Sequence, residues 1–336
     1  MISSRRLQEM PPLPTKKNCR EAVVISSPEK FEIVETELPQ PNEGEVRIKL
    51  EGSGINTSNL PIWEGRDSFS YPMLAGEPGR EGWGTIDAIG KNVEDFEEGD
   101  IVTCLSNHGF ATHDIARAEN VIKLPDPIST EPFPGEALGG SMNVFNRSNI
   151  QPNQTIAIVG CGFLGLLLVQ LTKSAGANVI AISKRDFSLE IAKKSGADYC
   201  IKLEDHNQII EKVNELTNGK FCDRVIETTA KELPLNLSVE LTAERGKLIV
   251  AGFHQEGIRN ENIQNLINHR IDMVSIHADP KEYIKGIKDA ILAIEKGLMN
   301  PYPLFTHSFS LHEIDEAFQY LKNRPDGFIK ALILNT

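Results

Sequence analysis

The sequence predicts an α/β chain in which a compact β domain precedes a doubly wound parallel sheet, and three observations lead to that prediction. The chain has 336 residues, more than one core usually supports, so two domains are expected. Residues 21–126 contain short apolar runs separated by turn clusters, which indicates strands. From residue 151 strands alternate with helices, which indicates parallel βαβ units with helices on both faces of a sheet.

The individual elements follow from the apolar runs and the turn residues between them. In the β domain, strands are expected at 21–25, 31–38, 45–51, 84–89, 101–104 and 121–124. In the second domain, strands are expected at 155–159, 178–183, 199–202, 223–227 and 246–251, and helices at 164–175, 187–195, 206–216 and 233–241. A helix at 281–296 follows, and residues 304–336 return to a strand, a helix at 311–322 and a last strand.

The most informative stretch is a glycine-rich turn between an apolar strand and an apolar helix, which reads G-C-G-F-L-G. The first glycine permits the tight turn, the second lets the backbone approach a pyrophosphate, and the third lets the helix pack on the strand. The unpaired N–H groups and the positive dipole end of the helix favour an anion. We therefore predict a dinucleotide site formed by Gly160, Gly162, Phe163, Leu164 and Gly165.

Three polar residues follow at the end of the next strand, where such a site usually places an acid that bonds the adenosine ribose. Here the strand ends in Ser183, and Lys184 and Arg185 come next. A hydroxyl and two cations suit a 2'-phosphate, because cations bind phosphate oxygens and no carboxylate stands in that position to repel them. We expect NADP as the cofactor. NAD stays open, since basic loop residues often only face solvent.

Composition excludes several classes of partner. The formal net charge is -12, whereas nucleic acids and anionic membranes require a basic face, so neither is expected as a partner. The sequence has no run of 18 or more apolar residues that would span a membrane. Residues 1–20 lack the apolar centre of a signal peptide and are expected to form a flexible extension. The five cysteines are widely spaced and form no C-x-x-C pair, as expected for reduced thiols of a cytoplasmic protein.

Several motifs, in order along the chain, resemble the medium-chain dehydrogenase/reductase superfamily over nearly all of the sequence after residue 20. Besides the glycine-rich turn, they are P-x-P-x-x-G-E-V at 39–46, G-I-N at 54–56, P-G-R-E-G-W-G at 78–84, G-D-I-V at 99–102, G-F-A at 109–111, A-K-K-S-G-A-D at 192–198, and the segment from T-H at 306–307 to A-F at 317–318. The resemblance implies a GroES-like β-barrel catalytic domain at 21–150, completed by 300–336, and a Rossmann nucleotide-binding domain at 151–299. It also implies an active site between the domains and a homodimer or homotetramer.

Two substitutions distinguish this chain from the zinc enzymes of that superfamily. Those enzymes typically read G-V-C-x-x-D and G-H-E-x-x-G, where this chain has Asn56 and Arg80 in place of the Cys and His. An amide oxygen is a poor zinc ligand and a guanidinium repels a cation, so no metal is expected. The alternative is a zinc alcohol or polyol dehydrogenase that uses Glu81 and Glu136 as atypical ligands. We favour pairing of both carboxylates with cations, with Arg80 as the foremost candidate.

Two polar residues are typical of the zinc-free quinone and enoyl reductases or of the alcohol dehydrogenases. Asn56 resembles the asparagine of the G-V-N-x-x-D motif, and Ser58 lies at the proton-relay position of the alcohol dehydrogenases. The resemblance implies direct hydride transfer to an activated carbon, with hydrogen bonds stabilising the oxyanion. Asn56 would donate such a bond, and Ser58 would deliver a proton. Both are also common turn residues that bond only to backbone.

Four further residues resemble positions beside the nicotinamide. Gly252, Phe253 and His254 follow the last strand of the second domain. His254 is a candidate general acid, although a lone histidine after a strand more often bonds within its own loop. Asn143 lies where relatives often carry a threonine that touches the cofactor, or else it caps a helix that it begins.

These observations predict a zinc-independent NADP(H) oxidoreductase that transfers hydride between the nicotinamide and a small carbonyl, alcohol or α,β-unsaturated carbonyl compound. The zinc-dependent dehydrogenase with carboxylate ligands is one alternative. A nucleotide-binding sensor or structural protein without turnover is the other, because an amide and a guanidinium replace former metal ligands.

Overall fold

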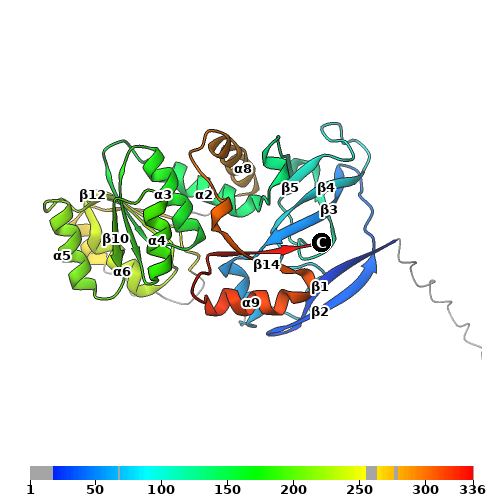
Figure 1. Cartoon of the computed structure of the whole chain (residues 1–336), viewed down its shortest axis with the longest axis horizontal. Helices are drawn as coiled ribbons and strands as arrows, with labels where there is room; N and C mark the ends of the chain where they lie inside the picture. The colour runs from blue at the N-terminus through cyan, green and yellow to red at the C-terminus, as the bar shows by residue number, and fades with distance from the viewer. Residues whose placement is uncertain (1–17, 67–68, 255–262, 276–278, 336) are drawn as a thin grey trace, which may run out of the picture.

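The computed structural model describes residues 18–66, 69–254, 263–275 and 279–335, and two parts lie side by side along its long axis (Figure 1). The part at the left of Figure 1 is a parallel sheet covered by helices, and the part at the right is mostly strands. The α/β class predicted from the sequence is thus confirmed. Within the described ranges, no helix has the length and apolar character needed to cross a membrane.

The β part contains two sheets. β1 (Cys19–Ser27) and β2 (Lys30–Glu37) form an antiparallel pair. The larger sheet has the order β14 (Phe305–Ser310), β15 (Lys330–Leu334), β3 (Glu45–Gly54), β4 (Glu81–Ile89), β5 (Ile101–Cys104) and β7 (Val121–Lys123), with β6 (His113–Arg117) paired to β3. β6 was not expected from the sequence, because its five residues form no apolar run.

The end of the chain completes this larger sheet. β15 is antiparallel to β3, with Leu332 opposite Gly54. The residues just before Leu332 therefore lie beside those just after Gly54. α1 (Leu60–Trp63) and α9 (Ile314–Asn323) cover the same part of the fold, where the rings of Trp63 and Phe318 pack against each other.

The nucleotide part is a six-stranded parallel sheet. Its order is β10 (Tyr199–Lys202), β9 (Asn178–Ser183), β8 (Thr155–Val159), β11 (Cys222–Glu227), β12 (Thr242–Val250) and β13 (Asp272–Ser275). From β8 the chain first adds β9 and β10 on one side of the sheet and then returns to add β11, β12 and β13 on the other side, so the strand order reverses between β8 and β11. Ligands of open parallel sheets bind at such a point, outside the carboxyl ends of the strands.

Helices cover both faces of the parallel sheet, as predicted. Successive side chains of a strand point to opposite faces. Ile156 and Ile158 of β8 belong to the core under α3 (Phe163–Ser174) and α4 (Asp186–Lys194), and Ala157 and Val159 belong to the core under α5 (His206–Leu216) and α6 (Glu232–Leu241). Burial on both sides explains why this strand is apolar throughout. A short helix, α7 (Ile263–Asn268), and β13 were not predicted.

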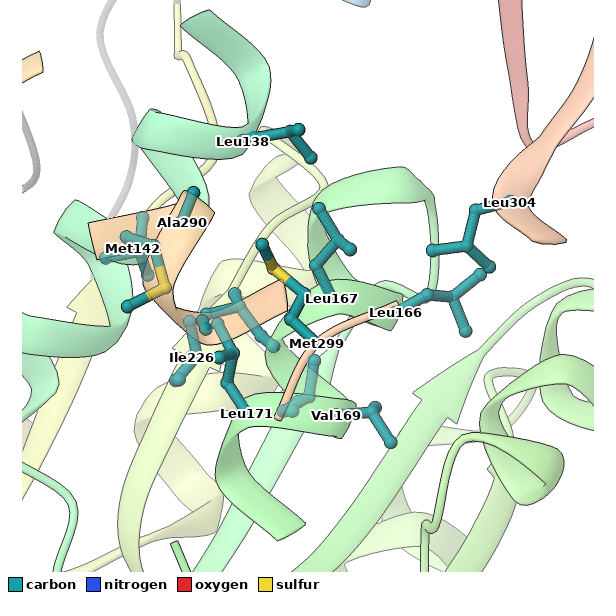
Figure 2. Close-up of a cluster of buried hydrophobic side chains, with 14 of the residues drawn as sticks. Leu138, Met142, Leu166, Leu167, Val169, Leu171, Ile226, Ala290, Met299 and Leu304 are labelled. Carbon is teal, nitrogen blue, oxygen red and sulfur yellow. The ribbon is translucent and has the colours of Figure 1, made fainter. Parts of the chain in front are cut away.

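Two helices lie between the parts: α2 (Gly135–Ser148) and α8 (Pro280–Glu295) (Figure 1). Figure 2 shows Leu138 and Met142 of α2 in one apolar cluster with leucines of α3 and with Ala290 of α8. A Cβ on Gly286 would lie 2.4 Å from the carbonyl oxygen of Gly139, so glycines allow the two helices to pack closely. The start of α2 was not expected from the sequence, because the segment G-E-A-L-G-G has low helix propensity.

The position of Asn143 corrects one expectation. Asn143 lies in the middle of α2, so it does not begin and cap a helix. Its side chain is buried against α8, since a Cβ on Gly286 would lie 2.6 Å from its Oδ1, and its Nδ2 has no partner among the described residues. A contact of Asn143 with the cofactor stays a prediction.

Candidate active site

The glycine-rich turn lies at the carboxyl end of β8, and its three glycines have distinct surroundings. Gly160 has a φ of 104°, which residues with side chains rarely adopt. A Cβ on Gly165 would lie 1.9 Å from the carbonyl oxygen of Gly160, so α3 approaches β8 only with a glycine there. A Cβ on Gly162 would meet nothing within 4 Å, which leaves open space beside the start of the helix. This space and the unpaired N–H groups of α3 fit a diphosphate.

Phe163 and Leu164 begin α3, but their side chains have protein partners. The ring of Phe163 stacks on Phe305 of the β part with 5.7 Å between ring centroids, and the ammonium group of Lys330 lies 5.1 Å from the Phe163 ring. Leu164 packs against the core shared by α2, α3 and α8. Their predicted part in cofactor binding therefore depends on backbone N–H groups. The contacts of Phe163 also place the start of α3 beside β15.

The end of β9 carries the three polar residues predicted to meet the ribose. Ser183 is buried, and its hydroxyl accepts a hydrogen bond from the backbone N–H of Arg185. Lys184 is exposed. The guanidinium of Arg185 donates to the carbonyl oxygen of Phe328 in the β part (2.5 Å). Burial, and then the nearby charge of Arg324, lower the pKa of Arg185. Arg324 is thus a third cation near this end of the sheet.

Asn56 lies in the turn between β3 and the short helix η2 (Thr57–Asn59), and both the oxygen and the nitrogen of its side-chain amide form hydrogen bonds. Its Oδ1 accepts from the backbone N–H of Ser58 (2.9 Å) and from the Ser58 hydroxyl (2.5 Å). Its Nδ2 donates to Oε1 of Glu81 (2.7 Å). Asn56 therefore caps a turn and also binds a carboxylate. The Ser58 hydroxyl points its proton at Asn56, so its delivery to a substrate requires that this hydrogen bond break.

Glu81 forms a buried ion pair, but its partner is not the cation expected from the sequence. Its Oε2 lies 2.6 Å from Nζ of Lys330, and the two side chains are 0% and 4% exposed. Lys330 also donates to the carbonyl oxygen of Ile55 (2.8 Å). The predicted pairing of Glu81 with Arg80 is wrong. Arg80 faces solvent, whereas β15 carries Lys330 directly to the start of β4.

Glu136 of α2, the second carboxylate, lies near a neutral group, the Tyr283 hydroxyl of α8. Burial, and then the charge of Glu81, raise the pKa of Glu136 to about 7, against the opposite effect of Arg80 and Lys330. The Tyr283 hydroxyl also favours the charged form of Glu136 and so acts to lower its pKa. No ion pair joins Glu136 to Arg80 in the part of the chain that the structure describes, so that predicted contact is also wrong. Arg80 acts on Glu136 only through its charge at longer range.

The residues around Asn56 do not fit a catalytic zinc ion. Zinc in proteins binds thiolates, imidazoles and carboxylates. Among the residues with described positions, no group of three or more His, Cys, Asp and Glu side chains could hold a metal. Glu81 is already neutralised by Lys330, and the charge of Arg80 is close by. A divalent cation would have to displace a buried ammonium group.

His254 follows β12 and bonds to Glu227 at the end of β11. Nε2 of His254 lies 3.0 Å from Oε2 of Glu227, and the two side chains are 16% and 0% exposed. Gly252 packs against the same turn, since a Cβ there would lie 2.4 Å from the backbone nitrogen of Ala230. Phe253 is 61% exposed. All three predicted residues thus lie at the carboxyl end of the sheet, and their contact with a nicotinamide stays a prediction.

Four residues of the site were not found from the sequence: Lys330, Glu227, Tyr283 and Arg324. Lys330 and Glu227 could have been found, because each is a charged residue in or at the end of an apolar strand. A charge is rarely buried there without a partner, so the pattern predicts a paired site. Tyr283 and Arg324 gave none, since they lie in an amphipathic helix and at a helix end.

Comparison with known proteins gives two family matches in the order predicted. Residues 42–126 match the family described as Alcohol dehydrogenase GroES-like domain, and residues 164–290 match Zinc-binding dehydrogenase. The chain is 27% identical to the starvation-sensing protein RspB of Escherichia coli, over 93% of this chain and 98% of that protein. It is 26% identical to the sorbitol dehydrogenase of Bacillus subtilis, over 93% of this chain and 96% of that protein.

Solved structures show the same fold. An Escherichia coli alcohol dehydrogenase, rspB, in complex with NADH has a TM-score of 0.84 at 24% identity. The match covers 94% of this chain and 99% of the rspB chain. A mycobacterial protein in complex with NADPH has a TM-score of 0.81 at 22% identity, with coverage of 94% and 99%. Both family matches, the relatives and the two-part fold agree: the chain belongs to the medium-chain dehydrogenase/reductase superfamily and is an oxidoreductase.

Proposed function

We propose that the protein is a zinc-independent NADP(H) oxidoreductase that reduces a small carbonyl or α,β-unsaturated carbonyl compound, or oxidises the corresponding alcohol. One observation carries the proposal. Asn56 stands at a position where zinc relatives carry a metal ligand, and its amide is bonded to Glu81, which forms a buried ion pair with Lys330. An ammonium ion supplies the positive charge that balances Glu81, so the site has no need of a metal to do so.

The chain's own residues would bind and orient the reactants around a nicotinamide that supplies or takes up hydride. The turn at Gly162 and the start of α3 bind the diphosphate. The second N–H of the Asn56 amide is left for the substrate oxygen, and the bond to Glu81 fixes the amide so that this group is aimed in advance. His254 would exchange the proton, because the Ser58 hydroxyl is engaged by Asn56.

The basic end of β9 supports NADP as the preferred cofactor. Lys184 is exposed, and Arg185 and Arg324 lie close enough for their charges to interact. Asp326 acts on Arg185 with the opposite sign, so three cations, Lys184, Arg185 and Arg324, stand against one acid. A 2'-phosphate would relieve the repulsion among these cations, whereas the ribose hydroxyl of NAD would not.

Titration with NADPH and NADH side by side tests this cofactor preference. Lys184→Ala and Arg324→Ala should each weaken NADPH binding by about tenfold, or ~1.4 kcal/mol, and leave the dissociation constant of NADH nearly unchanged. Equal losses for both nucleotides would contradict the assignment. Lys194→Ala, on the last turn of α4, serves as a control for the loss of one surface charge in the same domain.

Turnover itself is tested with NADPH and a panel of aldehydes, ketones, quinones and enones. One specific observation keeps a second function in view: a relative that aligns over nearly its whole length is named a starvation-sensing protein. A sensor without turnover would bind NADPH and oxidise it with no member of the panel. Assembly as a homodimer or homotetramer belongs to the same proposal, and light scattering of the purified protein tests it.

A further inference from the structure

We propose that Glu227 is the positioning residue of His254: it holds the Nε2 proton, so that Nδ1 is presented as the atom that exchanges a proton with the substrate oxygen. The inference rests on the proposed function, because it assigns a partner to a histidine already placed at the nicotinamide end of the site. It names a residue that the motifs of the sequence did not single out.

Glu227 is held as a carboxylate without any cation. It is fully buried, and its Oε1 accepts from the backbone N–H groups of Thr229 (2.5 Å) and Ala230 (3.0 Å) and from the Thr229 hydroxyl (2.5 Å). Three donors on one oxygen are the surroundings of an ionised carboxylate, which accepts hydrogen bonds only. Oε2 is then left to accept from His254, at 3.0 Å.

The tautomer of His254 follows from this contact. A neutral imidazole has one N–H donor and one lone-pair acceptor. Since Oε2 of Glu227 can only accept, the proton is on Nε2 and the lone pair is on Nδ1. Nδ1 is buried and has no hydrogen-bond partner within the described residues. A buried polar atom without a partner is costly, about 1–3 kcal/mol, and a catalytic role is one of the reasons for which native proteins keep such an atom.

The pair lies at the point where the sheet binds a dinucleotide. Glu227 ends β11, the strand next to β8 across the reversal of strand order. The next residue, Thr228, donates from its backbone to Val159 (2.9 Å) and from its hydroxyl to the carbonyl oxygen of Gly160 (2.7 Å). The turn that holds the carboxylate is therefore bonded to the glycine-rich turn. The adenosine half belongs over β9, so β11 and β12 receive the nicotinamide half.

The proton step balances with the hydride step. In alcohol oxidation, Nδ1 of His254 takes the proton as the substrate O–H bond breaks, and that electron pair forms the C=O bond. The electron pair of the adjacent C–H bond would leave as hydride, which an oxidised nicotinamide held by the glycine-rich turn would accept. The carboxylate of Glu227 stabilises the imidazolium ion that results. Reduction moves the same proton and hydride in the opposite direction.

The experiment compares wild type with Glu227→Gln, which keeps the shape of the side chain. The amide oxygen can still accept from Thr229 and Ala230, but the amide nitrogen then faces Nε2 of His254 and donates to it. The tautomer should invert, and Nδ1 should become a donor. We expect kcat to fall by about 10²–10³-fold with the dissociation constant of NADPH unchanged within about threefold. Glu244→Gln, an exposed change at the other end of β12, is the matched control and should keep wild-type kcat.

Nitrogen NMR of [15N]histidine-labelled protein reads the tautomer directly, with His254→Asn to assign the signal. The wild type should show a neutral ring protonated on Nε2, a result that stands even if Glu227→Gln does not fold. A ring protonated on Nδ1, or a Glu227→Gln variant with full kcat, would overturn the inference. If His254→Asn loses activity while Glu227→Gln does not, only the positioning role fails. If neither variant loses activity, the place of His254 in the proposed function fails as well.

Discussion

Two fully buried carboxylates, Glu81 in the β part and Glu227 in the nucleotide part, are held in opposite ways. Glu81 lies 2.6 Å from the ammonium group of Lys330, so its charge is neutralised by a side chain of the protein. Glu227 has hydrogen-bond donors and an imidazole but no lysine or arginine partner among the described residues. The first carboxylate is part of a closed network. The second leaves the imidazole nitrogen Nδ1 without a partner.

The difference separates what the two parts contribute. A neutralised carboxylate orients Asn56, but it has no charge left to stabilise a second cation. An ionised carboxylate with an imidazole on it can stabilise a proton that arrives during the reaction. On this account the β part supplies a fixed hydrogen-bond donor, and the nucleotide part supplies the group that exchanges a proton with the substrate.

The largest effect is expected from breaking the closed network. Lys330→Met removes the cation and leaves Glu81 buried without a partner, so the free energy of unfolding should fall by about 3–5 kcal/mol. Denaturant unfolding followed by circular dichroism measures the change. Adding Glu81→Gln to Lys330→Met should restore most of the loss, because no buried charge then remains. If the free-energy losses of Lys330→Met and Glu81→Gln simply add in the double variant, the two side chains are not coupled.

A smaller effect is expected from weakening the support of Glu227. Thr229→Val removes one of three donors to Oε1 and leaves both backbone N–H groups. Because a hydrogen bond to a charged group contributes about 2 kcal/mol, the free energy of unfolding should fall by about that amount. The same unfolding experiment checks it. A loss as large as that of Lys330→Met would mean that the two carboxylates depend on their partners equally.

The smallest effect is expected from Glu136, the carboxylate that neighbours Glu81, Arg80, Lys330 and Tyr283. Its pKa is raised to about 7, mainly by burial, so the folded state holds the proton more tightly than the unfolded chain does. Its stabilising contribution is complete below about pH 4 and is lost as pH rises through about 7. A pKa raised from 4.5 to about 7 corresponds to about 3 kcal/mol for a fully buried group. Because Glu136 is only half-buried, solvent reduces this value, and Glu136→Gln should unfold with about 1 kcal/mol more free energy than wild type at pH 8 and with no difference at pH 4. A constant difference across this range would contradict the raised pKa.

The fold was largely predictable because its signals are local. The glycine-rich turn, the apolar strands and the order of strands and helices are all written in short stretches of sequence, and the structure confirms them. The glycine-rich start of α2 was not expected from the sequence, because packing against α8, rather than helix propensity, stabilises it.

The candidate site was less predictable because its contacts are not local. The sequence predicts a cation as the partner of Glu81 and offers Arg80, the cation next to it along the chain, whereas the structure pairs Glu81 with Lys330, which is 249 residues away. Only the antiparallel pairing of β15 with β3 brings Lys330 to the site. Glu227 and His254 are likewise joined through neighbouring parallel strands, 27 residues apart.

The central claim, that hydride transfer proceeds beside the Glu81 and Lys330 pair without a divalent ion, is tested most directly by metal analysis of the active protein. The enzyme is purified without chelator, and its zinc content by plasma mass spectrometry is set against its rate of NADPH turnover before and after treatment with a chelator. The account predicts much less than one zinc ion per chain and an unchanged rate. One tightly bound zinc per chain, with activity lost on chelation and restored by zinc, would contradict it.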